Sequence, residues 1–155
     1  MSPAVSQARA VTVSGSDVYA AGSLQSGLEK QLAVVWKNDK AHFTLTDGQT
    51  DAGAIALCAD GRTLYTAGYV GTQAVVWKDA DLLYTLTDGS SSAEATAVCR
   101  SGSALYAAGY QVDGFENEGV VWKNGQELYD LSDGSAQGSL PYAIAVYGDD
   151  VFSAG

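Results

Sequence analysis

The pentapeptide Val18-Tyr19-Ala20-Ala21-Gly22 decides the fold, because the chain repeats it three more times. It returns as L-Y-T-A-G at 64–68, L-Y-A-A-G at 105–109 and V-F-S-A-G at 151–155. Two further segments repeat with it. They are V-V-W-K at 34–37, 75–78 and 120–123, and T-L-T-D-G or a close variant at 44–48, 85–89 and 130–134. The chain is therefore built from one repeating unit, whose tryptophans Trp36, Trp77 and Trp122 are 41 and 45 residues apart.

Each unit has the pattern of four short β-strands, A to D. In the third unit we predict them at 95–100, 104–109, 119–123 and 127–132. Between the last two lies Asn124-Gly125, a strong hairpin signal because both central residues of such a turn adopt positive φ. The Val-Val-Trp run is apolar at consecutive positions, which indicates a strand covered on both faces. A unit of about 41–46 residues with four strands predicts an all-β chain of four-stranded antiparallel β-propeller blades.

The repeat divides the chain into an N-terminal arm (1–9), three blades (10–50, 51–91 and 92–136) and a half blade (137–155) with strands A and B alone. Unpaired strand edges and uncovered blade faces favour association. We therefore predict an incomplete ring that is closed by oligomerisation or truncated, with a homodimer as the favoured assembly. In a lone chain we expect apolar surface from Ile144, Val146 and Val151 to be exposed.

The repeated segments resemble the propeller arrays of bacterial, often envelope-associated proteins, whose blades carry V-Y-x-A-G, W-K-N-G and L-T-D-G patterns. The resemblance runs from about residue 10 to residue 155. It implies the propeller fold and leaves the function open, since most such arrays are uncharacterised. It also implies a cell-envelope or secreted location, although Met1–Gln7 lacks the basic and apolar regions of a signal peptide.

Composition argues against several classes of partner. The chain of 155 residues has a formal net charge of −10, which disfavours nucleic acid and anionic membrane surfaces, because both attract clustered Lys and Arg. Its apolar runs are shorter than the ~20 residues that cross a bilayer, so we expect no membrane insertion. The single histidine, His42, excludes a two-histidine zinc site. Cys58 and Cys99 occupy equivalent positions in adjacent units, a poor geometry for a disulfide. We expect free thiols, no metal and no cofactor.

The connection between strands B and C varies most between units. It spans 14, 9 and 13 residues from the glycine of the pentapeptide to the following tryptophan. Binding residues concentrate on loops held by a rigid scaffold, and exposed aromatic residues are good anchors for a partner. Candidate binding residues on these connections are Tyr69, Tyr110, Asp113, Phe115, Glu116 and Glu118.

Up-and-down topology places the B–C and D–A connections on one face of the blades, here called the loop face. We assign nine acidic residues to it and two basic ones, Arg9 and Lys30. The acidic residues are Glu29, Asp47, Asp51, Asp88, Glu94, Asp113, Glu116, Glu118 and Asp133. An acidic face favours a cationic ligand or a basic peptide; the alternative interpretation is that these charges serve solubility.

Two repeated features have a structural and a functional interpretation. Trp36, Trp77 and Trp122 could stack on a sugar, but their register in an apolar strand favours a place in the core between blades. The Asp-Gly pairs at 47–48, 88–89 and 133–134 could line a cation site. A turn, in which Asp caps the backbone and Gly takes positive φ, is favoured.

These observations favour a non-catalytic binding or assembly module over an enzyme. The alternative is a propeller hydrolase or lyase with a site in the central channel, which needs acids, bases or metal ligands on strand A. Strand A instead supplies small and apolar residues such as Ala56, Leu57, Ala97 and Val98. A third possibility is a natural or engineered propeller fragment with no ligand.

Overall fold

The computed structural model describes residues 5–25, 30–132 and 138–155. In these ranges every regular element is a β-strand. The strands form three four-stranded antiparallel sheets and one two-stranded hairpin, and in each sheet the strands are joined in chain order. The prediction of four-stranded propeller blades is confirmed. The chain has three complete blades and the inner half of a fourth, arranged in an incomplete ring.

The strand bounds follow the repeat. Blade 1 contains β1 (Val5–Ser14), β2 (Asp17–Gln25), β3 (Leu32–Lys37) and β4 (Lys40–Thr44). Blade 2 contains β5 (Ala52–Asp60), β6 (Thr63–Val70), β7 (Gln73–Lys78) and β8 (Asp81–Thr85). Blade 3 contains β9 (Ala93–Ser101), β10 (Ala104–Asp113), β11 (Glu116–Lys123) and β12 (Gln126–Asp130). The half blade is the hairpin of β13 (Ala143–Tyr147) and β14 (Asp150–Ala154).

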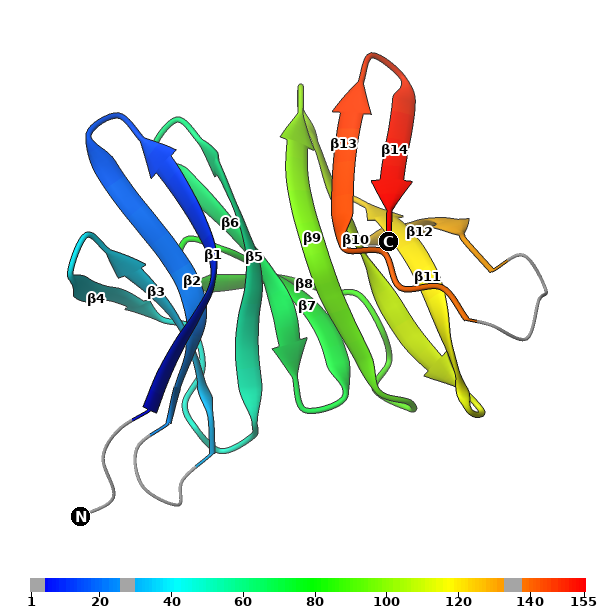
Figure 1. Ribbon diagram of the computed structural model, residues 1–155, viewed down its shortest axis with the longest axis horizontal. Helices are drawn as coiled ribbons and strands as arrows, with labels where there is room; N and C mark the ends of the chain where they lie inside the picture. Colours follow the sequence, from blue (N-terminus) through cyan, green and yellow to red (C-terminus); the bar gives the residue numbers. More distant parts are fainter. Residues whose placement is uncertain (1–4, 26–29, 133–137) are drawn as a thin grey trace.

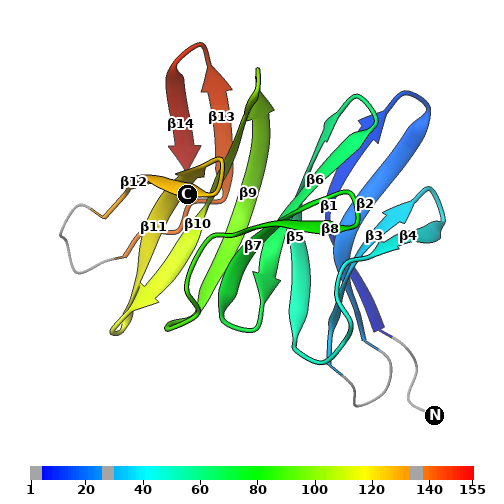
Figure 2. The same cartoon turned by 180° about the vertical axis from the view of Figure 1, so that it is seen from behind.

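The blades stand side by side in an open arc (Figure 1). The A strands β1, β5, β9 and β13 are neighbours along this arc, and the view from behind shows the outer strands β4, β8 and β12 in front of them (Figure 2). The loop face lies at the lower end of Figure 1, with the start of β1 and the tip of the β10–β11 hairpin. The opposite end carries the A–B turns, including the tip of the β13–β14 hairpin.

Two strand predictions differ from the structure. Residues 5–9, which we assigned to an arm, form the first part of β1, because Val5 to Ala8 pair with Gln25 to Gly22. In blade 3, β10 and β11 are longer than predicted and pair up to Asp113 and Glu116. The extra length makes the β10–β11 hairpin longer than the β6–β7 hairpin, where pairing ends at Val70 and Gln73.

A close approach of two backbones explains the glycine that ends the pentapeptide. A β-bulge interrupts strand A at Arg9, Ile55 and Thr96. Beside the bulge, a β-carbon on Gly68 would overlap the carbonyl oxygen of Gly53, and the same overlap occurs at Gly22, Gly109 and Gly155. Only glycine fits where another backbone comes this close. The bulge, in turn, changes the direction of the strand-A side chain.

The residue after Trp-Lys holds each blade together at its turn end. Asn38, Asp79 and Asn124 all have φ between 52° and 56°, a region that Asn and Asp tolerate better than most residues. In blade 2 the Asp79 N–H donates to the Leu64 carbonyl at 2.8 Å, and its side-chain oxygen accepts from the Leu64 N–H at 2.9 Å. The same pair of bonds joins Asn38 to Val18 and Asn124 to Leu105. The C–D turn is thus attached to the start of strand B.

The core lies between blades. Tyr65, Val76 and Ala107 belong to a cluster between blades 2 and 3 that Trp122 completes, while Trp77 completes the corresponding cluster between blades 1 and 2. Trp77 is 1% exposed and Trp122 is 2% exposed. The core position predicted for these two tryptophans is confirmed.

The outermost blade faces differ from this core. Trp36 is half-buried, because the blade that would cover it is not among the described residues. At the other end, Ile144 and Val151 pack on blade 3 and Val146 is half-buried, so the expectation that these three residues are exposed is wrong. The large hydrophobic side chains exposed on the hairpin are instead Tyr147 and Phe152, because alternate residues of a strand point to opposite faces.

Candidate functional site

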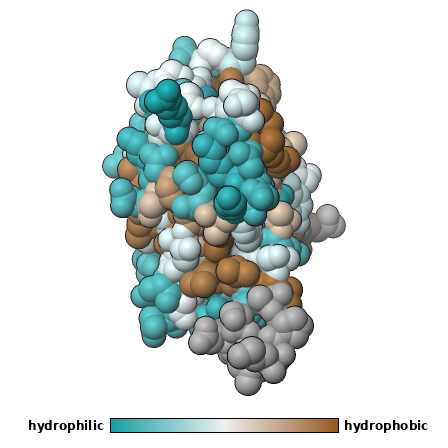
Figure 3. Space-filling model, turned by 90° about the vertical axis from the view of Figure 1, so that its left-hand side faces the viewer, coloured by the Kyte–Doolittle hydropathy of each residue, from teal (hydrophilic) through white to brown (hydrophobic). Residues whose placement is uncertain are grey.

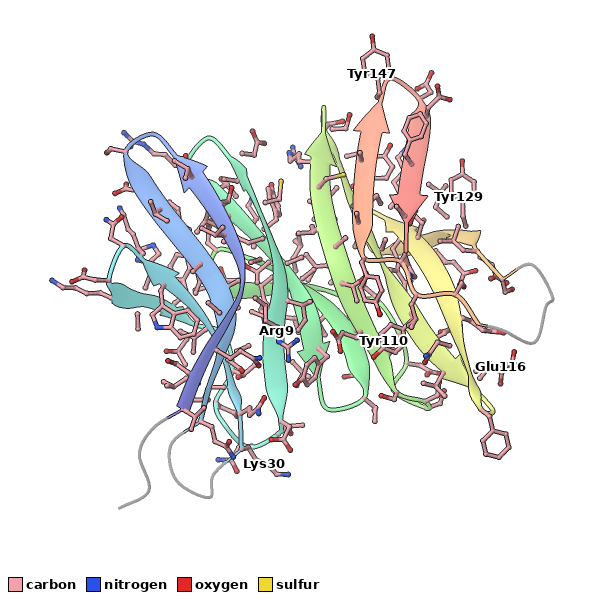
Figure 4. The ribbon with its side chains drawn as sticks, in the orientation of Figure 1. Arg9, Lys30, Tyr110, Glu116, Tyr129 and Tyr147 are labelled. Carbon is pink, nitrogen blue, oxygen red and sulfur yellow. The ribbon has the colours of Figure 1, made fainter. Side chains whose placement is uncertain are left out.

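Five side chains gather where the inner strands meet the loop face. We call Arg9, Tyr69, Glu94, Tyr110 and Tyr142 the inner cluster. Arg9 comes from the bulge of β1, Tyr69 from β6, Glu94 from β9 and Tyr110 from β10, while Tyr142 immediately precedes β13. Each of them interacts electrostatically with at least one other member. Figure 4 shows Arg9 and Tyr110 on the side of the arc that carries the inner strands.

Glu94 is the central charge of the inner cluster. It pairs across strands with Tyr110, whose hydroxyl donates to Glu94 Oε2 at the long distance of 3.5 Å. Burial raises the pKa of the Glu94 carboxyl above its usual value, while the Arg9 guanidinium and the Tyr110 hydroxyl partly oppose that rise. Among the contacts of the described residues, Arg9 attracts Glu94 without forming an ion pair with it.

The tyrosines of the inner cluster come from neighbouring blades. Tyr69 is on β6 of blade 2, and Tyr110 is on β10 of blade 3, next to Glu94. Tyr69 pairs with Gly53 across strands, and a β-carbon on Gly53 would lie 2.8 Å from the Tyr69 ring. The ring therefore occupies space that the side chain of any other residue at position 53 would need. Burial and the nearby Glu94 carboxylate raise the pKa of both tyrosines. Both residues are half-buried.

Blade 1 has a serine where blades 2 and 3 have these tyrosines. Ser23 pairs with Gln7, as Tyr69 pairs with Gly53 and Tyr110 with Glu94. A hollow of about 310 Å³ lies here, lined by Val5, Ser6, Gln7, Ser23, Gln25 and Gln31. The aromatic ring is thus what distinguishes the inner cluster from the same register of blade 1.

The predicted site residues separate into two groups. Tyr69 and Tyr110 belong to the inner cluster. Asp113, Phe115 and Glu116 form the tip of the β10–β11 hairpin, where Gly114 has φ +61°. Figure 4 shows Glu116 near this tip, away from Arg9. Phe115 is fully exposed, and Asp113 and Glu116 are directly opposite each other. Glu118 is half-buried and pairs with Gln111 further along the hairpin.

Several acidic residues of the loop face have structural partners. Lys30 Nζ lies 2.8 Å from Asp51 Oδ2, and the Lys30 ammonium is the main cause that lowers the pKa of Asp51. Asp47 and Asp88 each accept the backbone N–H two residues ahead, at 3.0 and 2.8 Å. These two Asp-Gly pairs are turns, as the favoured interpretation expected. Glu29 and Asp133 lie outside the described residues.

Possible metal ligands in the described parts of the chain include its two cysteines. Over residues 5–25, 30–132 and 138–155, no three His, Cys, Asp or Glu side chains are grouped as metal ligands would be. Cys58 and Cys99 are both free and half-buried, and burial raises the pKa of each thiol. The same ranges contain no helix with the length and apolar character needed to cross a bilayer.

Sequence reasoning missed Arg9 and Glu94 as members of one site. Both were assigned to the acidic loop face as separate charges, and strand A was taken as small and apolar. The missing signal was the β-bulge at Arg9, because a bulge changes the direction of a strand side chain.

Comparisons with known proteins were made by sequence and by structure. The sequence matches no protein-family model and no curated protein. Among solved structures, the chain is similar to the WD40 β-propeller domain of Doa1, with a TM-score of 0.43 and 17% sequence identity. The match covers 98% of this chain and 64% of that one.

Proposed function

We propose that this chain is a non-catalytic binding and assembly module, which closes a propeller ring by self-association of two copies. The observation that carries the proposal is the incomplete burial of Trp36, which is half-buried. It occupies the register at which Trp77 and Trp122 are covered by the preceding blade. A second copy would supply that cover.

The free face of blade 1 has the surface that such contact needs. Val11, Val13 and Val18 are exposed, and they lie on the side of the sheet that faces away from blade 2. Seen from this end, the surface has apolar patches separated by hydrophilic residues (Figure 3). Burial of apolar surface contributes about 25 cal/mol per Å², and a mixed surface is typical of interfaces between separately folded partners.

The free face of the half blade offers the complementary surface. Phe152 is 58% exposed and Tyr147 is 83% exposed. Phe152 is the repeat equivalent of Tyr19, which packs in the cluster that receives Trp77. The packing of one blade on the next inside the chain is therefore a template for a head-to-tail contact between copies. Two copies supply eight blade positions, within the usual range of four to eight blades.

Light scattering coupled to size-exclusion chromatography tests the proposal. We expect a species of twice the 16.0 kDa chain mass at micromolar concentrations. One variant, Val11→Lys with Val13→Lys, blocks the free face of blade 1. A second, Ala145→Lys with Phe152→Lys, blocks the half blade. Each variant alone should be monomeric, because every head-to-tail contact needs one face of each kind, and an equimolar mixture should recover a two-chain species.

The mixture distinguishes this arrangement from its alternatives. If identical faces paired with each other, one of the two variants would remain dimeric alone. Leu82→Lys is the matched control, because Leu82 is exposed on β8 and on neither end of the arc. A wild-type chain that stays at 16.0 kDa at about 100 μM would contradict the self-association. Thermal unfolding of each variant verifies that it is folded.

The tip of the β10–β11 hairpin supports a second candidate function, the binding of a cation or a basic peptide. Two carboxylates directly opposite each other on paired strands repel one another, and here Asp113 and Glu116 do so beside the fully exposed Phe115. A cation would relieve that repulsion, and the ring would add an apolar anchor.

Calorimetry with Ca²⁺ and with a cationic peptide tests this second candidate. Neutralising Asp113, Glu116 and Glu118 together, as Asn, Gln and Gln, should abolish the binding heat. Stability should be nearly unchanged, because Asp113 and Glu116 are exposed and Glu118 is half-buried. If neither probe gives heat at millimolar concentration, the acidic residues serve solubility alone.

The absence of catalysis is part of the proposal. The rival hydrolase or lyase needs an acid and a base positioned on one substrate. The inner cluster contains a single carboxylate, that of Glu94, and its other members are three tyrosines and an arginine. Tyrosines whose pKa is raised are weaker acids than usual, which suits hydrogen bonding to a ligand better than proton transfer.

A further inference from the structure

The inner cluster holds two opposite charges, those of Arg9 and Glu94, that attract each other. Arg9 of blade 1 attracts Glu94 of blade 3, and Tyr69 of blade 2, whose ring lies against Gly53, interacts with both charges. Over the described residues, neither side chain is part of an ion pair. The Glu94 carboxylate has one weak hydrogen bond, at 3.5 Å from Tyr110. A carboxylate can accept several hydrogen bonds, so its capacity is largely unused.

Tyrosine side chains lie near the Glu94 carboxylate. Tyr110 shares a strand pair with Glu94, Tyr69 lies against Gly53, and both tyrosines interact with the Glu94 charge. Tyr142 adds a third ring near Tyr110. Aromatic faces beside a carboxylate are suited to an ammonium group, which gains from both the ring quadrupoles and the charge.

Arg9 changes which ammonium compounds fit. A simple cation between the tyrosines would be attracted by Glu94 and repelled by the Arg9 guanidinium. A ligand that also has a carboxylate would place its negative end toward Arg9, and both ends would then be attracted. From this arrangement we propose that the inner cluster binds a small zwitterion, with its ammonium group against Glu94, Tyr69 and Tyr110 and its carboxylate toward Arg9.

Titration calorimetry with three probes tests the charge pattern. Trimethylglycine has both charges, choline has the cation alone and acetate has the anion alone. We expect trimethylglycine to bind at least about tenfold more tightly than either of the others, as a second charge contact of about 1.4 kcal/mol would produce. Equal affinity of choline and trimethylglycine would overturn the proposal. So would the absence of binding heat with trimethylglycine at about 100 mM, a concentration at which only negligible affinity would escape detection.

Three variants assign the two ends of the ligand. Glu94→Gln should weaken trimethylglycine about tenfold, and Tyr69→Ala should weaken it severalfold. Arg9→Ala should weaken trimethylglycine and strengthen choline, which reverses their order. A fold-damaging change would weaken both probes together, so the reversal is specific to the proposed orientation.

Glu127→Gln is the matched control, because it removes the same charge from an exposed position of the same blade, on β12 and outside both candidate sites. It should leave all three affinities unchanged. If Glu127→Gln weakened trimethylglycine as much as Glu94→Gln, the general acidity of the chain would account for binding and the site would be refuted. Because the probes report on a single chain, the result is independent of whether two copies associate.

Discussion

Trp77 and Trp36 occupy the same register of neighbouring blades and have different surroundings. Trp77 lies in the cluster between blades 1 and 2 and is 1% exposed. Trp36 lies on the free face of blade 1 and is half-buried. The two residues have the same neighbours along their own strand, V-V before and K after. Trp77 is covered by blade 1, whereas the described residues contain no blade in the corresponding position beside Trp36.

This comparison shows where the stability of a blade comes from. A blade is a twisted sheet that has to be covered on both faces, and its apolar residues alternate between the two neighbours. In blade 2, Val75 and Trp77 pack toward blade 1 while Val76 packs toward blade 3. Matched substitutions in blade 2 and in the terminal blades therefore measure how much one covered face contributes.

The largest effect is expected from Trp77→Ala. Truncation of a buried large side chain leaves a cavity and costs roughly 3–5 kcal/mol. Trp36→Ala should cost less than half as much in the monomer, because the ring already faces solvent in part. Denaturant unfolding of both variants gives the difference. Equal losses would show that Trp36 is covered in solution, which is the outcome expected at concentrations where two copies associate.

A smaller effect is expected where the glycine of the pentapeptide becomes alanine. In Gly68→Ala the new methyl group would overlap the Gly53 carbonyl oxygen, and strand A would have to move. Overpacking of this kind costs about 1–3 kcal/mol. Gly155→Ala creates the same overlap with Leu140, but the hairpin is packed on one face alone and can shift at lower cost. A Gly68→Ala protein with unchanged stability would refute the close approach of the two backbones.

The turn residue that follows Trp-Lys supplies the next comparison. Asp79→Ala leaves the Leu64 N–H without its side-chain acceptor, at a residue that is 2% exposed. A buried unpaired donor costs about 1–3 kcal/mol. Asn38→Ala does the same to Val18, which is 43% exposed, so water replaces the lost bond and the cost is lower. Asp79→Asn should restore most of the stability, since Asn occupies this position in blades 1 and 3.

The repeat made the blades predictable, because each repeated segment forms the same local contacts in every blade. The pentapeptide glycine allows the bulge, and the Thr of L-T-D-G accepts the strand-C N–H, as Thr46 does from Ala33 and Thr87 from Ala74. Departures from the repeat were not predictable. In blade 3 the Gly119 N–H donates instead to Ser139, a residue that belongs to the connection toward the half blade and to no repeated segment.

The candidate site was predictable in part, and for the same reason. Tyr69 and Tyr110 share a register with Ser23, so comparing the units was enough to find them. Arg9 and Glu94 come from different registers of different blades, and their interaction depends on how blades 1 and 3 are placed around the arc. No local pattern encodes that placement. The acidic residues at the hairpin tip were expected on a loop, but Asp113 and Glu116 are the last and first residues of β10 and β11. The length of these strands separates them from the tyrosines.

The smallest expected effect compares two carboxylates of the loop face, Glu94 in the inner cluster and Asp51 beside Lys30. Burial raises the pKa of Glu94 from its usual 4.5, so folding favours its protonated form, and the stability that this provides is present below pH 4.5 and lost as pH rises through the folded pKa. Glu94→Gln should therefore raise the unfolding temperature at pH 7, by at most about 2 °C, and the gain should vanish near pH 3.5. Asp51→Asn should do the reverse, because its pKa is lowered by Lys30 and neutralising it removes stability that is present at pH 7. Thermal unfolding of both variants at pH 7 and near pH 3.5 tests these expectations. A Glu94→Gln protein that is less stable than the wild type at pH 7 would mean that the attraction of Glu94 to Arg9 outweighs the cost of its burial.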